Sequence, residues 1–233
     1  PNMLIGKVLR SPYPHAIIKE INVEKAKSLP GVKAVLTYKD VPDWKMGLPP
    51  HLRVLDQKVR FVGDAVSLVA AETEEIAQEA LDLIEVEYEV LPAVFDAEEA
   101  IKEGAPQLYD EFPNNILPLG NPWFGSPEAP EGLKELRLGD VEKGFSEADV
   151  VVEGTFYYEN ITNPLPPEPP GAIAYWEDPK TVHVWLSSQG FYMDKISLYY
   201  IMQRKYNVIV HACQCGGSYG SKGTILPIAI YAI

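Results

Sequence analysis

A glycine-rich stretch near the carboxyl end of the chain holds the residues whose types and spacing could bind a ligand. It runs Cys213-Gln-Cys-Gly-Gly-Ser-Tyr-Gly-Ser-Lys222. Glycines let backbone N–H groups approach a ligand closely, and Lys222 adds a positive charge. The stretch therefore favours an anionic or oxygen-rich ligand such as a phosphate, while a tight turn without any ligand explains the glycines equally well.

The segments on either side of this stretch predict the elements that would position it. Residues 206–211 are rich in β-branched side chains, which is typical of a buried strand. Residues 224–233 are almost wholly apolar, and Pro227 stands near their start, where a buried helix would begin. The order strand, turn and helix places the turn at a helix N-terminus, which favours negative charge.

Two common phosphate-binding motifs do not match the stretch. A Walker A loop requires Ser or Thr directly after its lysine, whereas Gly223 follows Lys222. The dinucleotide fingerprint G-x-G-x-x-G fails because the glycines stand at positions 216, 217 and 220. A phosphate- or nucleotide-binding enzyme is therefore an alternative that depends on the glycines and the lysine alone.

The composition limits the classes of function. The chain has 233 residues, of which 46% are hydrophobic, and this allows one large or two ordinary domains. A net charge of −13 disfavours a surface for nucleic acid or for anionic membranes, and no segment is apolar enough over a membrane-spanning length. The two cysteines form a Cys-x-Cys pair, which indicates a reducing compartment. We expect a cytoplasmic protein with a small-molecule substrate.

The first hundred residues predict a small α+β domain. One strand is expected over residues 16–23 with an apolar face of Ile17, Ile21 and Val23, and Thr73 is expected to cap a helix. The other predicted elements are strands at 3–10, 32–37, 59–63, 65–71 and 85–90 and a helix at 24–28. We expect this domain to span residues 1–105.

The rest of the chain divides into a connector and a second unit. Residues 106–149 contain many prolines and glycines, which is typical of a connector. The second unit, over residues 150–233, is predicted to contain a strand at 150–158, a proline-rich extended segment at 162–171, a hairpin at 172–186 and a helix at 193–205. Because the last apolar helix has no cap, we expect a fragment or one piece of a split protein.

Four segments of the first region resemble, in order, signatures of the α/β hammerhead domain of the xanthine dehydrogenase and aldehyde oxidase family, the molybdenum hydroxylases. They are Arg10-Ser-Pro-Tyr-Pro-His-Ala16, Leu29-Pro-Gly-Val-Lys-Ala-Val-Leu36, Val62-Gly-Asp-Ala-Val66 and Ile84-Glu-Val-Glu-Tyr-Glu-Val-Leu-Pro92. The resemblance implies an α+β fold, in which a hammerhead domain is followed by the start of a mixed α/β molybdopterin-binding domain.

The glycine-rich stretch is similar to the family's Gly-Gly-Gly-Phe-Gly-Gly-Lys-Glu element, which lies against the molybdenum centre. The residues that match it are Gly216, Gly217, Gly220 and Lys222, with Tyr219 at the position of the family's aromatic residue. Ser218 and Ser221 replace glycines. Gly223 stands where many members have a glutamate that contacts the substrate in purine-oxidising enzymes, so the resemblance does not extend to a purine substrate.

The end of the predicted hairpin, Ser187-Ser-Gln189, resembles the family's Thr/Ser-Gln pair, whose glutamine hydrogen-bonds an oxygen ligand of molybdenum. The resemblance implies this role for Gln189, since a neutral amide donates a hydrogen bond without adding a competing charge. Lys222 would steady the loop or an anionic group of the cofactor. The residues that would wall the cofactor site are Gly216, Gly217, Ser218, Tyr219 and Gly220. No residue is expected to bind the metal directly.

The proline-rich segment resembles the family's His-x-Pro-Met-Glu-Pro element. Glu168 and Pro169 match its end, and Pro164 replaces its histidine. A glutamate here could act as a general base, or as a structural carboxylate that accepts hydrogen bonds from the backbone; we favour the structural interpretation. The same choice arises for His15, which lies between turn prolines and is interpreted as a structural residue.

The resemblance implies a molybdenum hydroxylase that oxidises an aldehyde or an N-heterocycle with oxygen from water. The family's catalytic glutamate and most pterin contacts lie beyond the position of Ile233, so no catalytic residue is expected in this chain, which would be inactive alone. The implied partners are the C-terminal molybdopterin-binding part, an iron–sulfur subunit with [2Fe–2S] centres and an FAD subunit. A second alternative is a degenerate, non-catalytic scaffold, in which Ser218, Ser221 and Gly223 no longer build the site.

Overall fold

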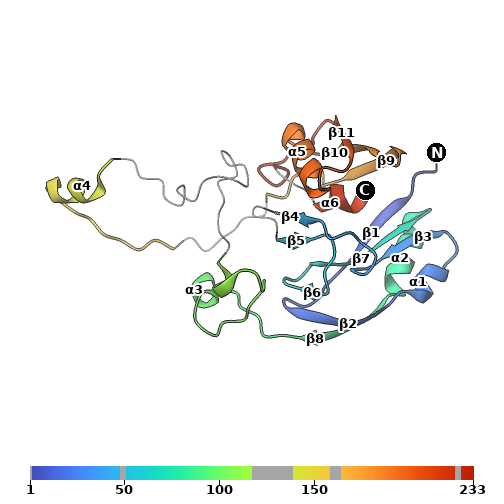
Figure 1. Cartoon of the computed structure of the whole chain (residues 1–233), viewed down its shortest axis with the longest axis horizontal. Helices are drawn as coiled ribbons and strands as arrows, with labels where there is room; N and C mark the ends of the chain where they lie inside the picture. Colours follow the sequence, from blue (N-terminus) through green and yellow to red (C-terminus); the bar gives the residue numbers. More distant parts are fainter. Residues whose placement is uncertain (1, 48–50, 117–138, 158–163, 224–226) are drawn as a thin grey trace.

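The computed structural model describes residues 2–47, 51–116, 139–157, 164–223 and 227–233 (Figure 1). The elements of the first part are β1 (Ile5–Arg10), β2 (Ala16–Asn22), α1 (Glu24–Ser28), β3 (Val32–Leu36), β4 (Lys45–Met46), β5 (Leu52–Arg53), β6 (Lys58–Val59), β7 (Ala65–Ala71), α2 (Glu74–Asp82) and β8 (Glu85–Val90). The remaining elements are α3 (Ala97–Ala100), the 3-10 helix η1 (Pro113–Asn115), α4 (Val141–Glu147), β9 (Ala172–Asp178), β10 (Thr181–Leu186), α5 (Phe191–Ile201), β11 (Asn207–Ala212) and α6 (Pro227–Ala232).

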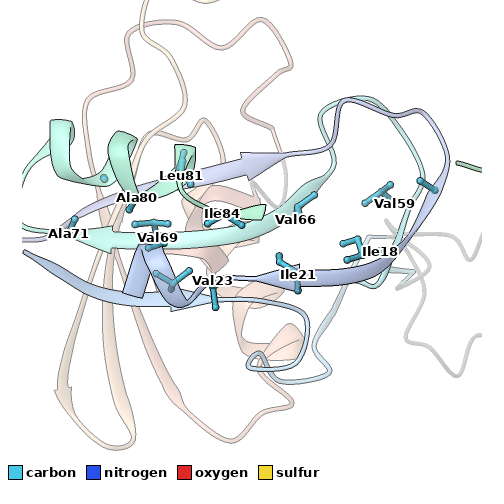
Figure 2. Packing of buried hydrophobic residues seen from close by; sticks show 14 residues of the cluster. Ile18, Ile21, Val23, Val59, Val66, Val69, Ala71, Ala80, Leu81 and Ile84 are labelled. Carbon is cyan, nitrogen blue, oxygen red and sulfur yellow. The ribbon is translucent and has the colours of Figure 1, made fainter. Parts of the chain in front are cut away.

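The first part contains two antiparallel sheets, with strand orders β1-β7-β3 and β6-β2-β8. Helix α2 packs against β1 and β7, and its predicted cap is confirmed, since Thr73 Oγ1 accepts a hydrogen bond from the Ile76 N–H at 3.3 Å. Figure 2 shows the apolar core that the two sheets share with this helix. The fully buried residues of this core include Ala16, Ile18, Val59, Val66 and Ala71.

Strand β2 and the residue after it bury Ile21 and Val23 as expected, but Ile18 is buried in place of Ile17. Ile18 is completely buried, and Ile17 is only half-buried. The pairing of β2 with β8 shifts register between Ile18 and Glu20. Such a bulge reverses the alternation of side chains, so Ile18 and Ile21 both point into the core although they are three residues apart.

Two predicted strands are wrong. The strand expected at residues 59–63 ends at Val59, because the Arg60 N–H donates to the side chain of Asp64 at 3.0 Å, and the chain then turns. The strand expected at 150–158 does not form over the described residues 150–157, where Val152 and Phe156 are 89% and 94% exposed. A run of β-branched residues forms a strand only where another strand pairs with it.

The second part is built on the sheet β11-β10-β9. Strands β9 and β10 form the predicted antiparallel hairpin, and β10 pairs in parallel with β11 through the crossover helix α5. Helix α5 spans Phe191–Ile201, whereas the sequence predicts a helix at 193–205, and its Tyr199 and Tyr200 are exposed. Helix α6 begins at Pro227, as the sequence predicts.

The two parts share apolar contacts. Met46 and Val54, which belong to the first part of the sequence, lie in the core of the second sheet. In return, Tyr231 of α6 packs against a small cluster that includes Leu55 and Leu68. Figure 1 shows β4 and β5 lying beside α6 and the second sheet. The segment around β4 and β5 therefore fixes how the sheet that carries Gln189 is seated on the first part.

Candidate functional site

The topology of the second sheet brings the predicted site residues together. Strands β10 and β11 are parallel, so the residues that follow them emerge at the same edge of the sheet. Gln189 follows β10, and the glycine-rich stretch follows β11. The backbone N–H of Gln189 donates to the carbonyl oxygen of Lys222 at 3.2 Å. The two elements that the sequence singled out are therefore neighbours.

A short chain of hydrogen bonds joins Gln189 to the loop. The Lys222 N–H donates to Ser218 Oγ at 2.9 Å, and the Ser218 hydroxyl donates to Gln189 Oε1. Among the described residues, nothing accepts a hydrogen bond from Gln189 Nε2. A Cβ atom added at Gly223 would lie 3.4 Å from this nitrogen. The Gln189 side chain is thus held by its oxygen, and no residue that the structure describes takes up its two N–H donors.

The backbone of the loop adopts left-handed conformations that glycine permits. Gly217 and Gly220 have φ values of 100° and 97°. Tyr219, between them, has a φ of 52° and is 71% exposed. A tyrosine rarely adopts this conformation, and such strain is concentrated at functional sites. The loop therefore presents an exposed aromatic side chain, whose ring lies close to Gly217.

Lys222 lies at the centre of a second, buried cluster. Its side chain is 0% exposed, and its Nζ donates to Glu168 Oε2 at 2.7 Å and to Ser187 Oγ at 2.8 Å. Glu168 Oε2 also accepts from the Gly216 N–H at 2.8 Å. A Cβ atom at Gly216 would lie 2.6 Å from the Glu168 Cβ, so only glycine fits against this glutamate. The cluster ties the proline-rich segment, the end of β10 and the glycine-rich loop together.

The hydrogen bonds of this cluster determine whether Glu168 could act as a base and where the Lys222 ammonium points. The hydrogen bonds from Lys222, then Ser187 and then Gly216, lower the pKa of Glu168 from its ordinary 4.5 to about 2. A carboxylate with so low a pKa is a poor base near neutral pH. The hydrogen bond from the Gly216 N–H agrees with the structural interpretation of Glu168. Lys222 directs its ammonium group to this carboxylate.

His15 is also structural. It is buried, and its Nδ1 lies 2.6 Å from the carbonyl oxygen of Pro92, beyond the end of β8. It packs within the first part of the chain rather than among the loop residues. The histidine therefore ties the turn before β2 to the segment that follows β8.

The sequence does not single out two polar residues of this region, Ser187 as a hydrogen-bonding group and Asp194. Asp194 is buried on α5, where its Oδ2 accepts a hydrogen bond from the Ser188 hydroxyl and burial raises its pKa. Among the described residues, its Oδ1 has no partner. The signal that could have found it is an acidic residue at the start of the predicted helix that follows the Ser-Ser-Gln run.

The loop offers donors that suit an oxygen-rich ligand. Within the part of the chain that the structure describes, the backbone N–H groups of residues 217–220 have no acceptor. Together with Gln189 Nε2 they form a group of hydrogen-bond donors at one edge of the sheet. Cys213 and Cys215 are free and half-buried. In the same described ranges, no three His, Cys, Asp or Glu side chains are placed to hold a metal ion.

No helix in the described segments combines the length and the apolar character that a membrane crossing needs.

Two protein-family models match the chain. Residues 1–92 match the model for the a/b hammerhead domain of aldehyde oxidase and xanthine dehydrogenase. Residues 126–233 match the model for the molybdopterin cofactor-binding domain. These matches follow the expected order, and they confirm the fold class that the sequence predicted. The domain limits at residues 105 and 149 stay predictions.

Individual relatives agree with both models. The chain is 36% identical over 228 residues to a probable xanthine dehydrogenase subunit of Bacillus subtilis, covering 95% of this chain and 28% of that protein. It is 33% identical over 198 residues to the nicotinate dehydrogenase large molybdopterin subunit of Eubacterium barkeri, covering 84% and 43%.

A solved structure shares the fold. The aldehyde oxidoreductase from Desulfovibrio desulfuricans matches with a TM-score of 0.79 at 24% identity, over 99% of this chain and 26% of that one. The chain therefore spans less than half the length of these three proteins. It belongs to the xanthine dehydrogenase and aldehyde oxidase family of molybdenum hydroxylases, and corresponds to part of their molybdopterin-binding large subunit.

Proposed function

We propose that this chain forms one wall of the cofactor site of a molybdenum hydroxylase. The observation that carries the proposal is the meeting of Gln189 with the glycine-rich loop at the carboxyl edge of β10 and β11. Ligands of α/β sheets bind at such edges, where the loops after parallel strands converge. The available N–H donors of Gln189 and of residues 217–220 suit the oxygen atoms of a molybdenum–molybdopterin cofactor.

Some residues of this chain would contact the cofactor, and others would support the loop that does. Gln189 would donate a hydrogen bond to an oxygen of the cofactor, and Gly216, Gly217, Ser218, Tyr219 and Gly220 would form the wall around it. Of the two roles expected for Lys222, we retain the support of the loop, because its ammonium is buried against Glu168. That buried position also disfavours the alternative in which Lys222 binds a phosphate or nucleotide directly.

The oxidation itself depends on groups outside this chain. When bound, the molybdenum cofactor supplies the oxygen transfer and accepts the electrons. We propose that the catalytic base and most pterin contacts come from a C-terminal molybdopterin-binding part, and that electrons leave through [2Fe–2S] centres and FAD on partner domains or subunits. The chain alone would then be inactive. A cytoplasmic location fits the free thiols of Cys213 and Cys215.

The proposed substrate is an aldehyde or an N-heterocycle. Gly223 stands beside Gln189, where a glutamate would contact the substrate in purine-oxidising members of the family. Without a carboxylate at this position, Gly223 offers no fixed charge to orient a purine. One named relative is named for nicotinate and another for xanthine, so the proposed substrate class depends on Gly223 rather than on the relatives.

The test uses the complete protein, purified with its cofactor and any subunits that co-purify. We expect stoichiometric molybdenum, and oxidation of some members of a panel of aldehydes and N-heterocycles, with the new oxygen taken from H₂¹⁸O. Gln189→Ala should lower the rate about 10- to 100-fold, in the range seen when groups that support a metal site are removed. Gln78→Ala, at an exposed position on α2, is the matched control and should leave the rate unchanged.

The same measurement separates the scaffold alternative from the enzyme. A degenerate scaffold would carry no stoichiometric molybdenum and would oxidise no member of the panel. A nucleotide-binding protein would instead show a thermal shift with a nucleotide in the absence of molybdopterin. Either result would contradict the proposal.

A further inference from the structure

We propose that Ser218 is a positioning residue that fixes the side-chain amide of Gln189 with its NH₂ group facing the ligand side of the loop. This inference rests on the proposed function, because the orientation of the amide matters only if Gln189 faces the cofactor. Ser218 stands at a position where the family's motif has a glycine, and a glycine has no hydroxyl group to offer.

The direction of the hydrogen bonds determines which end of the amide Ser218 holds. Ser218 Oγ accepts a hydrogen bond from the backbone N–H of Lys222 at 2.9 Å. Ser218 is buried, and among the described residues its hydroxyl proton has only the amide oxygen of Gln189 as acceptor. If the amide were flipped, its NH₂ would face the hydroxyl and the buried O–H would lose its acceptor, which is costly. The hydroxyl therefore selects the orientation with Oε1 inward.

On the side away from Ser218, no described residue accepts a hydrogen bond from the amide nitrogen of Gln189. A Cβ atom at Gly223 would lie 3.4 Å from Gln189 Nε2 and 3.3 Å from the carbonyl oxygen of Gly220, so a side chain there would crowd the amide. The backbone of Gln189 is held as well, since its N–H donates to the Lys222 carbonyl oxygen at 3.2 Å. Gln189 is thus fixed at its backbone and at its amide oxygen, and its two side-chain N–H donors have no acceptor among the described residues.

The orientation has a chemical consequence. An amide NH₂ donates to the oxygen atoms of a ligand, whereas an amide oxygen would repel them. A glutamine with a freely rotating amide would present the wrong end for part of the time. Groups that orient the residues in contact with a metal centre commonly change activity or affinity about 10- to 100-fold when they are removed.

The experiment compares three single variants of the complete protein, purified with its cofactor and co-purifying subunits. Ser218→Ala removes the hydroxyl, and we expect kcat to fall about tenfold. Ser218→Thr keeps a hydroxyl and should restore most of the rate. Ser221→Ala is the matched control: its hydroxyl donates to the Ser218 carbonyl oxygen at 2.7 Å without touching Gln189, and we expect the parent rate.

A second readout does not depend on turnover. The molybdenum(V) electron paramagnetic resonance signal, recorded after partial reduction, reports the surroundings of the metal. We expect Ser218→Ala to change this signal in the same direction as Gln189→Ala while molybdenum content is retained, and Ser221→Ala to leave it unchanged. Loss of molybdenum in Ser218→Ala, when Gln189→Ala retains it, would show that Ser218 supports the loop instead and would overturn the inference.

A double-mutant cycle separates positioning from structural support. If Ser218 acts through Gln189, Ser218→Ala has no further effect in the Gln189→Ala background. An equal fall of kcat in both backgrounds would overturn the role of Ser218 and leave that of Gln189 intact. If Gln189→Ala by itself changes neither the rate nor the signal, the proposed function of Gln189 is wrong, and the inference falls with it.

Discussion

The first part of the chain and the loop region are held together by different physics. The first part is stabilised by apolar side chains from two sheets and two helices, which form a single cluster with Ile18 fully buried. The loop region is held by polar contacts around one buried lysine, which joins Glu168, Ser187 and the loop backbone. Apolar burial is proportional to area and has no direction, whereas the polar contacts require particular atoms at particular places.

This difference accounts for our placing the proposed cofactor site in the loop region. A group that must donate a hydrogen bond toward a ligand has to be fixed in direction, and packing alone does not fix the end-to-end orientation of an amide. The hydrogen bonds from the Lys222 N–H to the Ser218 hydroxyl, and from that hydroxyl to the Gln189 amide oxygen, supply that direction. Apolar cores stabilise both parts of the chain, and the polar contacts of the loop region fix its geometry.

The largest expected effect comes from opening a cavity in the apolar core. Ile18→Ala, at a fully buried position of β2, should lower the free energy of unfolding by about 2–5 kcal/mol, because it removes transfer free energy and leaves a cavity. Urea unfolding at constant m-value measures this change. Ile101→Ala, at a position that is 53% exposed, should change the stability by less than about 0.5 kcal/mol. Equal effects at the two positions would refute the importance of the apolar cluster that contains Ile18.

A smaller effect is expected where the polar region allows no side chain. Gly216→Ala would place a Cβ atom 2.6 Å from the Glu168 Cβ, so the loop or the proline-rich segment must shift. We expect a loss of about 1–3 kcal/mol, as for overpacked sites, together with loss of molybdenum from the complete protein. Gly171→Ala makes the same change nearby, where a Cβ atom meets nothing within 4 Å. It should be tolerated, and an equal loss there would show that the Glu168 contact is unimportant.

The smallest effect is a pH dependence. Because the pKa of Glu168 in the folded protein is about 2, below its ordinary 4.5, the ionised carboxylate stabilises the fold above pH 4.5. This contribution is lost as the pH falls through 2. Glu168→Gln should therefore lower the unfolding midpoint at neutral pH, and the difference from the parent should shrink between pH 4.5 and 2. The exposed Glu103→Gln is the control, and its curve should run parallel to that of the parent throughout.

Much of the fold could be predicted from local sequence. The cap of α2 by Thr73, the hairpin of β9 and β10, and the start of α6 at Pro227 follow from side-chain types at fixed spacings. The failures share a cause. The bulge in β2, the turn that Asp64 imposes after β6 and the exposed segment 150–157 all depend on which strand or side chain lies opposite, and this information is not local.

Local signals are enough to predict that Gln189 and the glycine-rich loop follow two strands of one unit, because strands, helices and loops are marked by neighbouring residues. The partner of the Lys222 charge depends on contacts between distant segments. The sequence left its ammonium free to serve either the loop or a ligand. Folding places Glu168, 54 residues away in the chain, 2.7 Å from that ammonium and buries the lysine completely. A buried charge needs a partner, and this pairing is the reason why we assign Lys222 to the support of the loop.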